Sequence, residues 1–321
     1  MTETILIESG GMSAEILPMG ASIRALRPVG VEHSVVLGLE DLGLYGPGNS
    51  DYFGATVGRF ANRIGKGHLV VDGQTYDLAV NDPPNHLHGG PGGFSTRLWS
   101  VDERRPDGVT LSYTSADGEE HYPGTLRVTA DFQLSGDANE LAISYQAESD
   151  RETVVNLSSH LYFNLAGAGP VTSHQLGLAA NHYLPIDDGT LPDGRILSVD
   201  DTLFDYRAGR SLDERPQPLD HNFCLADTKA GEPRLAARLA SGQSRIAMEL
   251  LTTEPGLQVY DGAKLDGTFR DLAGRPIEAF WGLALEPQGW PDAPNRANFP
   301  SAVLRPGETY RHRSLYRFSR L

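Results

Sequence analysis

Residues 125–147 read TLRVTADFQLSGDANELAISYQA, and this stretch decides the expected fold. Apolar and polar residues alternate from Thr125 to Leu134 and again from Glu140 to Ala147. Such alternation is typical of β-strands with one buried face, because successive side chains point to opposite sides of a sheet. Turn-forming residues fill the connection at Ser135–Asn139. The stretch therefore predicts an antiparallel β-hairpin.

The same pattern recurs along the chain. Short strands are expected at Ala14–Leu17 and Ser34–Leu37, and hairpins at His68–Val71 with Gln74–Val80 and at Leu235–Leu239 with Ile246–Leu250. The first hairpin turns at Asp72-Gly73, a strong two-residue turn signal. A short helix over Arg234–Leu239 remains an alternative to the strand there. Strands at this spacing, with few helical patterns, predict an all-β antiparallel sandwich or barrel with few short helices.

Nothing in the composition marks a domain boundary. The 36 glycines and 21 prolines are spread over the 321 residues rather than gathered in one linker. A chain of this length buries about 75% of its unfolded surface, so stability requires neither disulfides nor metal. We expect one domain over residues 1–321.

The charge balance restricts the partners. The chain carries 27 basic and 42 acidic residues, for a formal net charge of -15. Nucleic acids and anionic membranes are bound by positive surfaces, so we expect neither, and a neutral small molecule is the favoured ligand. The single cysteine, Cys224, gives no sign of an oxidising compartment, and in its apolar setting we expect a buried thiol. MTETILIESGG does not resemble a signal peptide, so we expect a cytoplasmic protein, either a monomer or a homodimer.

Several cofactor and nucleophile motifs are missing from the sequence. It has no G-x-G-x-x-G after a strand, no G-x-x-x-x-G-K-[ST] loop, no G-x-S-x-G elbow and no C-x-x-C pair. We therefore expect no nucleotide cofactor and no serine-hydrolase chemistry. No cofactor of any kind is required by the residues that remain.

Residues able to do chemistry gather in five segments: 58–64, 85–94, 155–165, 219–223 and 283–295. The first offers Arg59 and Arg63 beside Asn62. The second holds His86 and His88, which would share one side of a strand, either as metal ligands or as one site residue and one bystander.

The other three segments place polar groups in apolar, strand-like settings. His160 interrupts one such run. Asp220 and His221 are neighbours, so only one of them should enter any one site. Glu286 ends another apolar run, and Pro287 should end its ladder. Trp290 either stacks on a ligand or packs in the core, and the sequence leaves both open.

In order along the chain, these segments resemble aldose 1-epimerases, also called galactose mutarotases. The matching stretches are GRFANRI, NHLHGGPGGF, VNLSSHLYFNLAG, LDHNFCL, EPGLQVYDG and EPQGWPDAPN, with ILPMGASIRAL and RPGETYRHRSLYRF near the two ends. The resemblance covers essentially the whole chain. It implies a large antiparallel β-sandwich with a sugar cleft on one face and no metal in the site.

By this resemblance, Glu286 is the general base and His160 the general acid, and six residues hold the sugar: Asn62, Arg63, His88, Tyr162, Asp220 and Gln258. The sequence departs from the family pattern at Pro287, where Thr is frequent, and at Ser158-Ser159, where Thr-Asn is frequent. His88 is an alternative to His160 as the acid.

The chemistry implied is exchange of the α and β anomers of a free aldose. An unperturbed Glu is ionised at neutral pH, and modest surroundings raise the pKa of a His toward neutrality, which suits a base and an acid respectively. Three alternatives stay open: a sugar-binding β-sandwich without catalysis, a metal enzyme using His86, His88, His160 and Glu286, and an epimerase of a modified or phosphorylated sugar.

Overall fold

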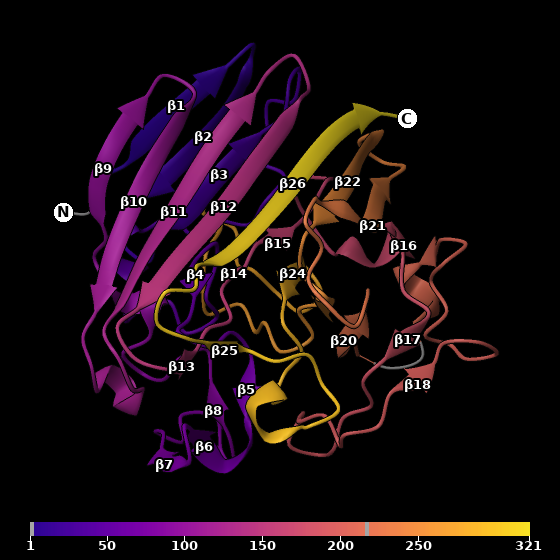
Figure 1. Ribbon diagram of the computed structural model, residues 1–321. Coiled ribbons are helices and arrows are strands. Elements are labelled where there is room, and N and C mark those ends of the chain that lie inside the picture. The colour runs from indigo at the N-terminus through magenta and orange to yellow at the C-terminus, as the bar shows by residue number, and fades with distance from the viewer. Residues whose placement is uncertain (1–2, 216–217) are drawn as a thin grey trace.

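The computed structural model describes residues 3–215 and 218–321 (Figure 1). Every pair of named strands in these ranges is antiparallel, and every helix is a single 3₁₀ turn. None of these helices is long and apolar enough to cross a lipid bilayer. The expected all-β class is therefore confirmed.

The largest sheet has nine strands and contains two of the predicted hairpins. The segment quoted first forms β11 and β12, which pair from Leu126↔Ser149 to Ser135↔Glu140. Residues 234–239, for which a short helix was the alternative to a strand, form part of strand β21, and β21 pairs with β22. In sheet order, the strands are β19 (Arg210–Ser211), β16 (Gln175–Leu178), β21 (Arg234–Ser241), β22 (Ile246–Thr252), β26 (Tyr310–Arg320), β12 (Glu140–Ser149), β11 (Leu126–Ser135), β10 (Gly108–Ser115) and β9 (Ser100–Arg105).

A second sheet of six strands carries most of the motifs. Its strand order is β15 (Tyr162–Phe163), β24 (Leu283–Gln288), β23 (Gly256–Tyr260), β20 (Asp220–Cys224), β17 (His182–Tyr183) and β18 (Leu197–Ser198). Leu257, Val259 and Leu285 point into the main core, and the residues between them point to the opposite face. The sheet thus has an apolar face and a polar one.

The two sheets share one apolar core. Phe163 of β15 lies 5.4 Å, between ring centroids, from Tyr316 of β26, and Met248 and Leu250 of β22 belong to the same buried cluster as Leu257. In Figure 1 β26 runs diagonally across the middle of the molecule. The polar face of the six-stranded sheet is therefore turned away from the nine-stranded sheet.

The remaining elements are short. One further sheet joins β1 (Ile5–Ser9), β2 (Met12–Leu17) and β3 (Ser22–Arg27), and four strand pairs join β4 (Thr56–Val57) with β14 (Ser158–Ser159), β5 (Arg63–Ile64) with β8 (His86–Leu87), β6 (His68–Val71) with β7 (Gln74–Asp77), and β13 (Thr153–Val154) with β25 (Val303–Leu304). The 3₁₀ turns are η1 (Leu42–Leu44), η2 (Gly65–Gly67), η3 (Phe94–Thr96), η4 (Glu119–His121), η5 (Val171–Ser173), η6 (Leu212–Glu214) and η7 (Ala293–Asn295).

Three strand predictions need correction. Ser34–Leu37 forms only an isolated bridge at Val36, because the Ser34 hydroxyl bonds the backbone of Leu26 and Val36 in place of a ladder. The second strand of the Asp72-Gly73 hairpin ends at Asp77 rather than Val80.

The third correction concerns Pro287, which does not end its ladder. β24 continues to Gln288, with Pro287 opposite Leu257. On its other side β24 pairs with β15 only at Leu283 and Ala284. A proline is tolerated in a strand where its nitrogen faces a side without a ladder partner.

Candidate active site

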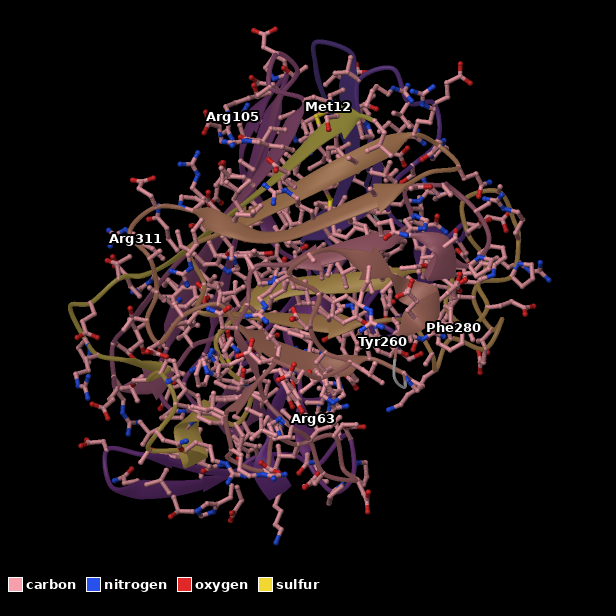
Figure 2. The ribbon with its side chains drawn as sticks, turned by 90° about the vertical axis from the view of Figure 1, so that its right-hand side faces the viewer. Met12, Arg63, Arg105, Tyr260, Phe280 and Arg311 are labelled. Carbon is pink, nitrogen blue, oxygen red and sulfur yellow. The ribbon has the colours of Figure 1, made fainter. Side chains whose placement is uncertain are left out.

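A cavity of about 190 Å³ opens on the polar face of the six-stranded sheet. Three groups of residues line it: Asp220, Tyr260 and Glu286 from the sheet strands, His160 and Tyr162 at β15, and a set from the first third of the chain that includes Tyr52, Asn62, Arg63, Asp82 and His88. In Figure 2 Tyr260 and Arg63 lie on the same side of the molecule. The motifs of distant segments therefore converge on one pocket.

Glu286 and His160 form the centre of this pocket. His160 Nε2 lies 3.7 Å from Glu286 Oε1, and their side chains are 5% and 2% exposed. Tyr162 pairs with Ala284 in antiparallel strands. His160 lies two residues before Tyr162 and Glu286 two residues after Ala284, so the pairing brings His160 and Glu286 together. A buried carboxylate beside an imidazole is suited to proton transfer.

Burial moves the pKa values of this pair in opposite directions. Desolvation, aided by Asp220 and opposed by Arg63, raises the pKa of Glu286 to about 8. Desolvation lowers the pKa of His160 to about 4. The solution-based expectation of an ionised Glu286 and a raised His160 pKa is therefore reversed in the ligand-free pocket, because removing water disfavours the charged form of each group.

One wall of the pocket is a chain of charged and amide groups. Arg63 Nε donates to Asp82 Oδ2 at 2.7 Å, and Arg63 Nη1 lies 3.8 Å from Asp220 Oδ2. On its other oxygen Asp220 accepts a hydrogen bond of 2.6 Å from Gln258 Nε2. Asp220 and Arg63 are thus held side by side with polar atoms facing the cavity, which suits contacts to neighbouring sugar hydroxyls.

The protonation of His88 is set by the backbone. Asn62 N–H donates to His88 Nδ1 at 3.0 Å, so this nitrogen is an acceptor. Burial lowers the pKa of His88 well below its usual value, so the ring is neutral and carries its proton on Nε2. His88 therefore presents an N–H donor, and Tyr52 packs edge-on against it at 4.6 Å between ring centroids.

The hydrogen bond from Asn62 N–H to His88 Nδ1 also bears on the alternative that this pocket binds a metal ion. Ligand atoms of His88, His160 and Glu286 lie within 4.8 Å of one another, a spacing that a metal ion could use. A ligating histidine, however, normally donates its other ring N–H to an acceptor. His88 Nδ1 faces a donor instead, and His160 Nδ1 has no hydrogen-bond partner among the residues described. The surrounding hydrogen bonds therefore suit a proton-transfer site better than a metal centre.

His86 does not lie with His88, His160 and Glu286 in the pocket. Its strand, β8, ends at Leu87, and His88 adopts φ +51°, so the two histidines do not share a side as the strand pattern predicted. His86 instead bonds the Ala79 carbonyl at 2.7 Å and the Tyr122 hydroxyl at 2.7 Å. It is a buried structural histidine.

Of the eight residues that the sequence nominated, seven line the pocket: Asn62, Arg63, His88, His160, Tyr162, Asp220 and Glu286. Gln258 is buried behind them and bonds Asp220. His221 points away and packs on Phe204, as expected for the neighbour of Asp220.

Three other sequence candidates are structural. Arg59 is buried and donates to the carbonyls of Pro123 and Gly124. Trp290 packs edge-on against Phe299 and lies outside the cavity, which settles its role as packing. Cys224 is buried, and burial raises the pKa of its thiol, as expected for an inert cysteine.

Several lining residues carried no recognisable sequence signal. Tyr52 and Asp51 come from an irregular loop, Tyr260 is the last residue of β23, and Lys264 lies in the loop after it. Asp82 had the one available clue, since it stands three residues before the NHLHGGPGGF motif. Its ion pair with Arg63 joins two stretches of the chain that local sequence patterns do not connect.

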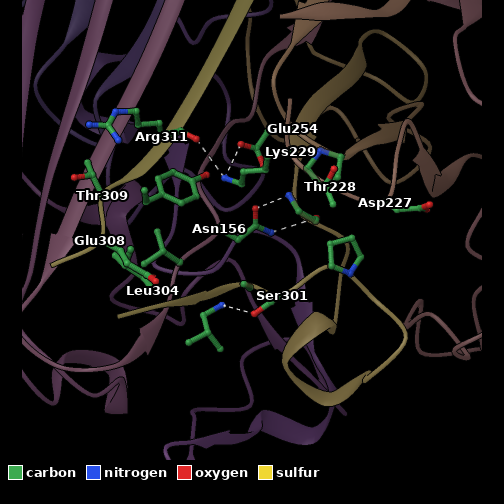
Figure 3. Close-up of a pocket in the computed structure, with 17 residues that line it drawn as sticks. Asn156, Asp227, Thr228, Lys229, Glu254, Ser301, Leu304, Glu308, Thr309 and Arg311 are labelled. Carbon is green, nitrogen blue, oxygen red and sulfur yellow. Dashed lines mark hydrogen bonds and ion pairs between the residues drawn. The ribbon is translucent and has the colours of Figure 1, made fainter. Parts of the chain in front are cut away.

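A larger cavity, of about 490 Å³, is lined in part by Gly289, the residue that follows β24 (Figure 3). In it Lys229 Nζ lies 2.8 Å from Glu254 Oε1 and 3.6 Å from the centroid of the Tyr310 ring. Its buried carboxylate is thus already paired with a lysine. Asn156, whose amide bonds Gly289, lies between this cavity and the Glu286 strand. The smaller pocket is the one on which the residues nominated from the sequence converge, and it is therefore the candidate active site.

Comparison with known proteins decides the family. The family model described as aldose 1-epimerase matches residues 3–317. The chain belongs to the aldose 1-epimerase family. Among similar proteins, the galactose mutarotase of Rattus norvegicus is 41% identical over 327 residues, covering 99% of this chain and 94% of that protein. The aldose 1-epimerase of Escherichia coli K12 is 34% identical, covering 98% and 94%.

Solved structures of the family share the fold. The aldose epimerase homologue from C. elegans superposes with a TM-score of 0.93 at 32% identity, covering all of both chains. The galactose 1-epimerase of Lactobacillus acidophilus gives a TM-score of 0.84 at 25% identity, covering 100% of this chain and 99% of that one. The expected galactose mutarotase-like fold is therefore confirmed.

Proposed function

We propose that this chain is an aldose 1-epimerase, which interconverts the α and β anomers of a free aldose such as galactose or glucose. The contact between His160 and Glu286, whose side chains are buried 3.7 Å apart, carries this proposal. A protein that only binds sugar has no use for an acid beside a base. Membership of the family and the 41% identity to a galactose mutarotase support the same reaction.

The reaction needs only proton transfers. Glu286 takes the proton of the C1 hydroxyl while His160 delivers one to the ring oxygen, so the C1–O5 bond breaks and an open aldehyde forms. Rotation about C1–C2 presents the other carbonyl face, and reclosure reverses both transfers. The pair begins and ends with one proton, so the balance requires no metal and no nucleotide.

The pKa values support a one-proton pair. With the pKa of Glu286 near 8 and that of His160 near 4, the two groups together hold one proton at neutral pH. A sugar hydroxyl donating to the carboxylate favours the ionised glutamate, and a ring oxygen accepting from the imidazole favours the protonated histidine. Substrate binding therefore moves that proton to the histidine before the ring opens.

The remaining lining groups would hold the sugar. Arg63, Asp220, Asn62 and Tyr162 are assigned to its hydroxyls, His88 donates through Nε2, and Gln258 acts by fixing Asp220. Outside the catalytic pair, two cations, Arg63 and Lys264, face three carboxylates in the lining: Asp51, Asp82 and Asp220. This balance favours a neutral sugar over a phosphorylated one.

Polarimetry tests the proposal. Freshly dissolved α-D-galactose and α-D-glucose should reach their final rotation faster with the protein than without it, and the order of rates ranks the sugars. If neither sugar responds, nor arabinose, xylose or fucose, the activity is absent. A cytoplasmic location and a monomeric or homodimeric state remain proposals; the single cysteine is compatible with a reducing compartment.

A further inference from the structure

Besides Gln258, two buried amides, Asn222 and Gln288, lie on the same polar face of the six-stranded sheet as Glu286. Asn222 pairs across the strands with Gln258, and Gln258 pairs with Glu286. In the next row Gly256 pairs with Gln288. Because side chains alternate along each strand, Asn222, Glu286 and Gln288 point to the same side. The polar surface of the pocket thus extends one row deeper than its open part.

Because Gly256 has no side chain, it leaves room for the amide of Asn222. A Cβ atom at this position would lie 2.6 Å from Asn222 Oδ1 and 3.1 Å from Asn222 Nδ2. The Asn222 side chain therefore lies over Gly256, leaning toward the row that holds Gln288. Any other residue at 256 would push this amide away from that row.

These amides are buried without hydrogen-bond partners. Asn222 is 1% exposed and Gln288 is fully buried. Within residues 3–215 and 218–321, neither polar atom of either amide has a partner in the protein, and the same is true of Glu286 Oε2. Leaving such a group unsatisfied is energetically costly, so buried polar groups of this kind are normally bridged by internal water. An internal water typically makes about three hydrogen bonds.

We propose that Asn222 and Gln288 hold a buried water that donates a hydrogen bond to Glu286 Oε2, and that both are positioning residues for this carboxylate. The inference rests on the proposed function, in which Glu286 is the base. The water accepts from one amide N–H and donates its two hydrogens to an amide oxygen and to Oε2. Oε1 then stays directed at His160 and the sugar.

Neither amide lines the open pocket, so both act through Glu286 rather than on the sugar. A hydrogen bond to the ionised carboxylate favours that form. Other groups also act on Glu286: His160 at 3.7 Å, Asp220, which raises its pKa, and Arg63, which lowers it. None of these three is changed by removing the amides, so the contribution of the water can be measured separately.

The test compares Gln288→Met with the matched control Gln146→Met, which replaces an exposed glutamine of β12. The test measures the mutarotation rate against pH. In Gln288→Met, the pH above which the rate falls (the alkaline limb) should rise by about one unit. The plateau below that pH should fall about tenfold, since the ionised form of Glu286 becomes rarer. KM should stay within about twofold, because the sugar contacts are intact. Asn222→Leu should shift the limb in the same direction, and Gln146→Met should match the unmodified protein.

The outcomes separate the two proposals. Absence of mutarotation by the unmodified protein would remove the proposed function itself. An active unmodified protein whose alkaline limb is unmoved in Gln288→Met would overturn the water-mediated role, even if the plateau falls. If the variants fail to fold, a high-resolution crystal structure of the unmodified protein decides. A water bonded to both amides and to Oε2 supports the proposal, and amides bonded only to each other overturn it.

Discussion

At the scale of single residues, the activity depends on where one proton resides. Glu286 and His160 lie 3.7 Å apart, and burial gives them pKa values near 8 and 4, the reverse of their order in solution. Sequence identified both residues through their motifs. It could not give the order of their pKa values, because desolvation arises only when segments 155–165 and 283–295 pack against each other.

The pH profile should therefore have a plateau between about pH 4 and about pH 8. Below about pH 4 the pair takes up a second proton and loses its base; above about pH 8 it loses its only proton and has no acid. The measurement is kcat/KM for mutarotation against pH, corrected for the buffer-catalysed reaction. A rate that keeps rising above pH 9 after correction would contradict this assignment.

Removing metal ions should leave the activity unchanged. His88 Nδ1 accepts the Asn62 N–H, which leaves the wrong nitrogen protonated for a metal ligand. Protein dialysed against a chelator should keep its full rate, and elemental analysis should find no stoichiometric metal. Loss of activity that added Zn²⁺ restores would instead favour the metal reading of His88, His160 and Glu286.

At the scale of elements, the pocket is built by strands that no local pattern could pair. The hairpins β11–β12 and β21–β22 were predictable, since alternation and turn residues are local signals. The contact of β14 with β4 joins Ser158 to Val57 across about a hundred residues. Asp82 was missed for the same reason, because its partner Arg63 lies in another motif.

The two departures from the family pattern turn out to be in contact. The Ser158 hydroxyl donates to the carbonyl of Pro287 at 2.8 Å, directly beside Glu286. A proline at 287 gives up its N–H but keeps this acceptor. The sequence showed both departures, and only the fold shows that they form one contact.

The Asn156 side chain links the segment that contains Asn62 to the segment that follows Glu286, and its removal should lower both stability and activity. Its Nδ2 donates to the carbonyls of Ala61 and Gly289, and its Oδ1 accepts from Gly289 N–H at 2.7 Å. Asn156→Ala should lower the free energy of unfolding by about 1–3 kcal/mol and reduce kcat as well, because Asn62 and Glu286 adjoin the freed segments.

Urea unfolding measures the change in stability of Asn156→Ala, and steady-state kinetics measures its kcat. The control is Asn298→Ala, which removes an exposed hydrogen bond to Gly194 and should change stability by less than about 0.5 kcal/mol. Equal stability of the two variants would mean that Asn156 does not join the segments.

At the scale of the whole molecule, we propose that residues 1–321 fold as one domain. Phe163, Leu257 and Tyr316, from both large sheets, belong to one buried cluster, and the nine-stranded sheet alone joins strands from β9 (Ser100–Arg105) to β26 (Tyr310–Arg320). Composition suggested a single unit, but it could not reveal that β12 pairs with the C-terminal strand β26.

Calorimetry should therefore record one unfolding transition, with the calorimetric enthalpy equal to the van 't Hoff enthalpy. Two resolved transitions, or a van 't Hoff enthalpy near half the calorimetric value, would show that the sheets unfold as separate domains.

The most direct test of the catalytic assignment is the mutarotation rate of Glu286→Gln, followed by polarimetry on α-D-galactose. We predict a loss of about 10²–10⁴-fold, with the fold retained and sugar still bound, since the amide cannot take the C1 proton. Circular dichroism and calorimetric titration with the sugar verify these two conditions. A Glu286→Gln variant that is folded and turns over at close to the unmodified rate would contradict the account.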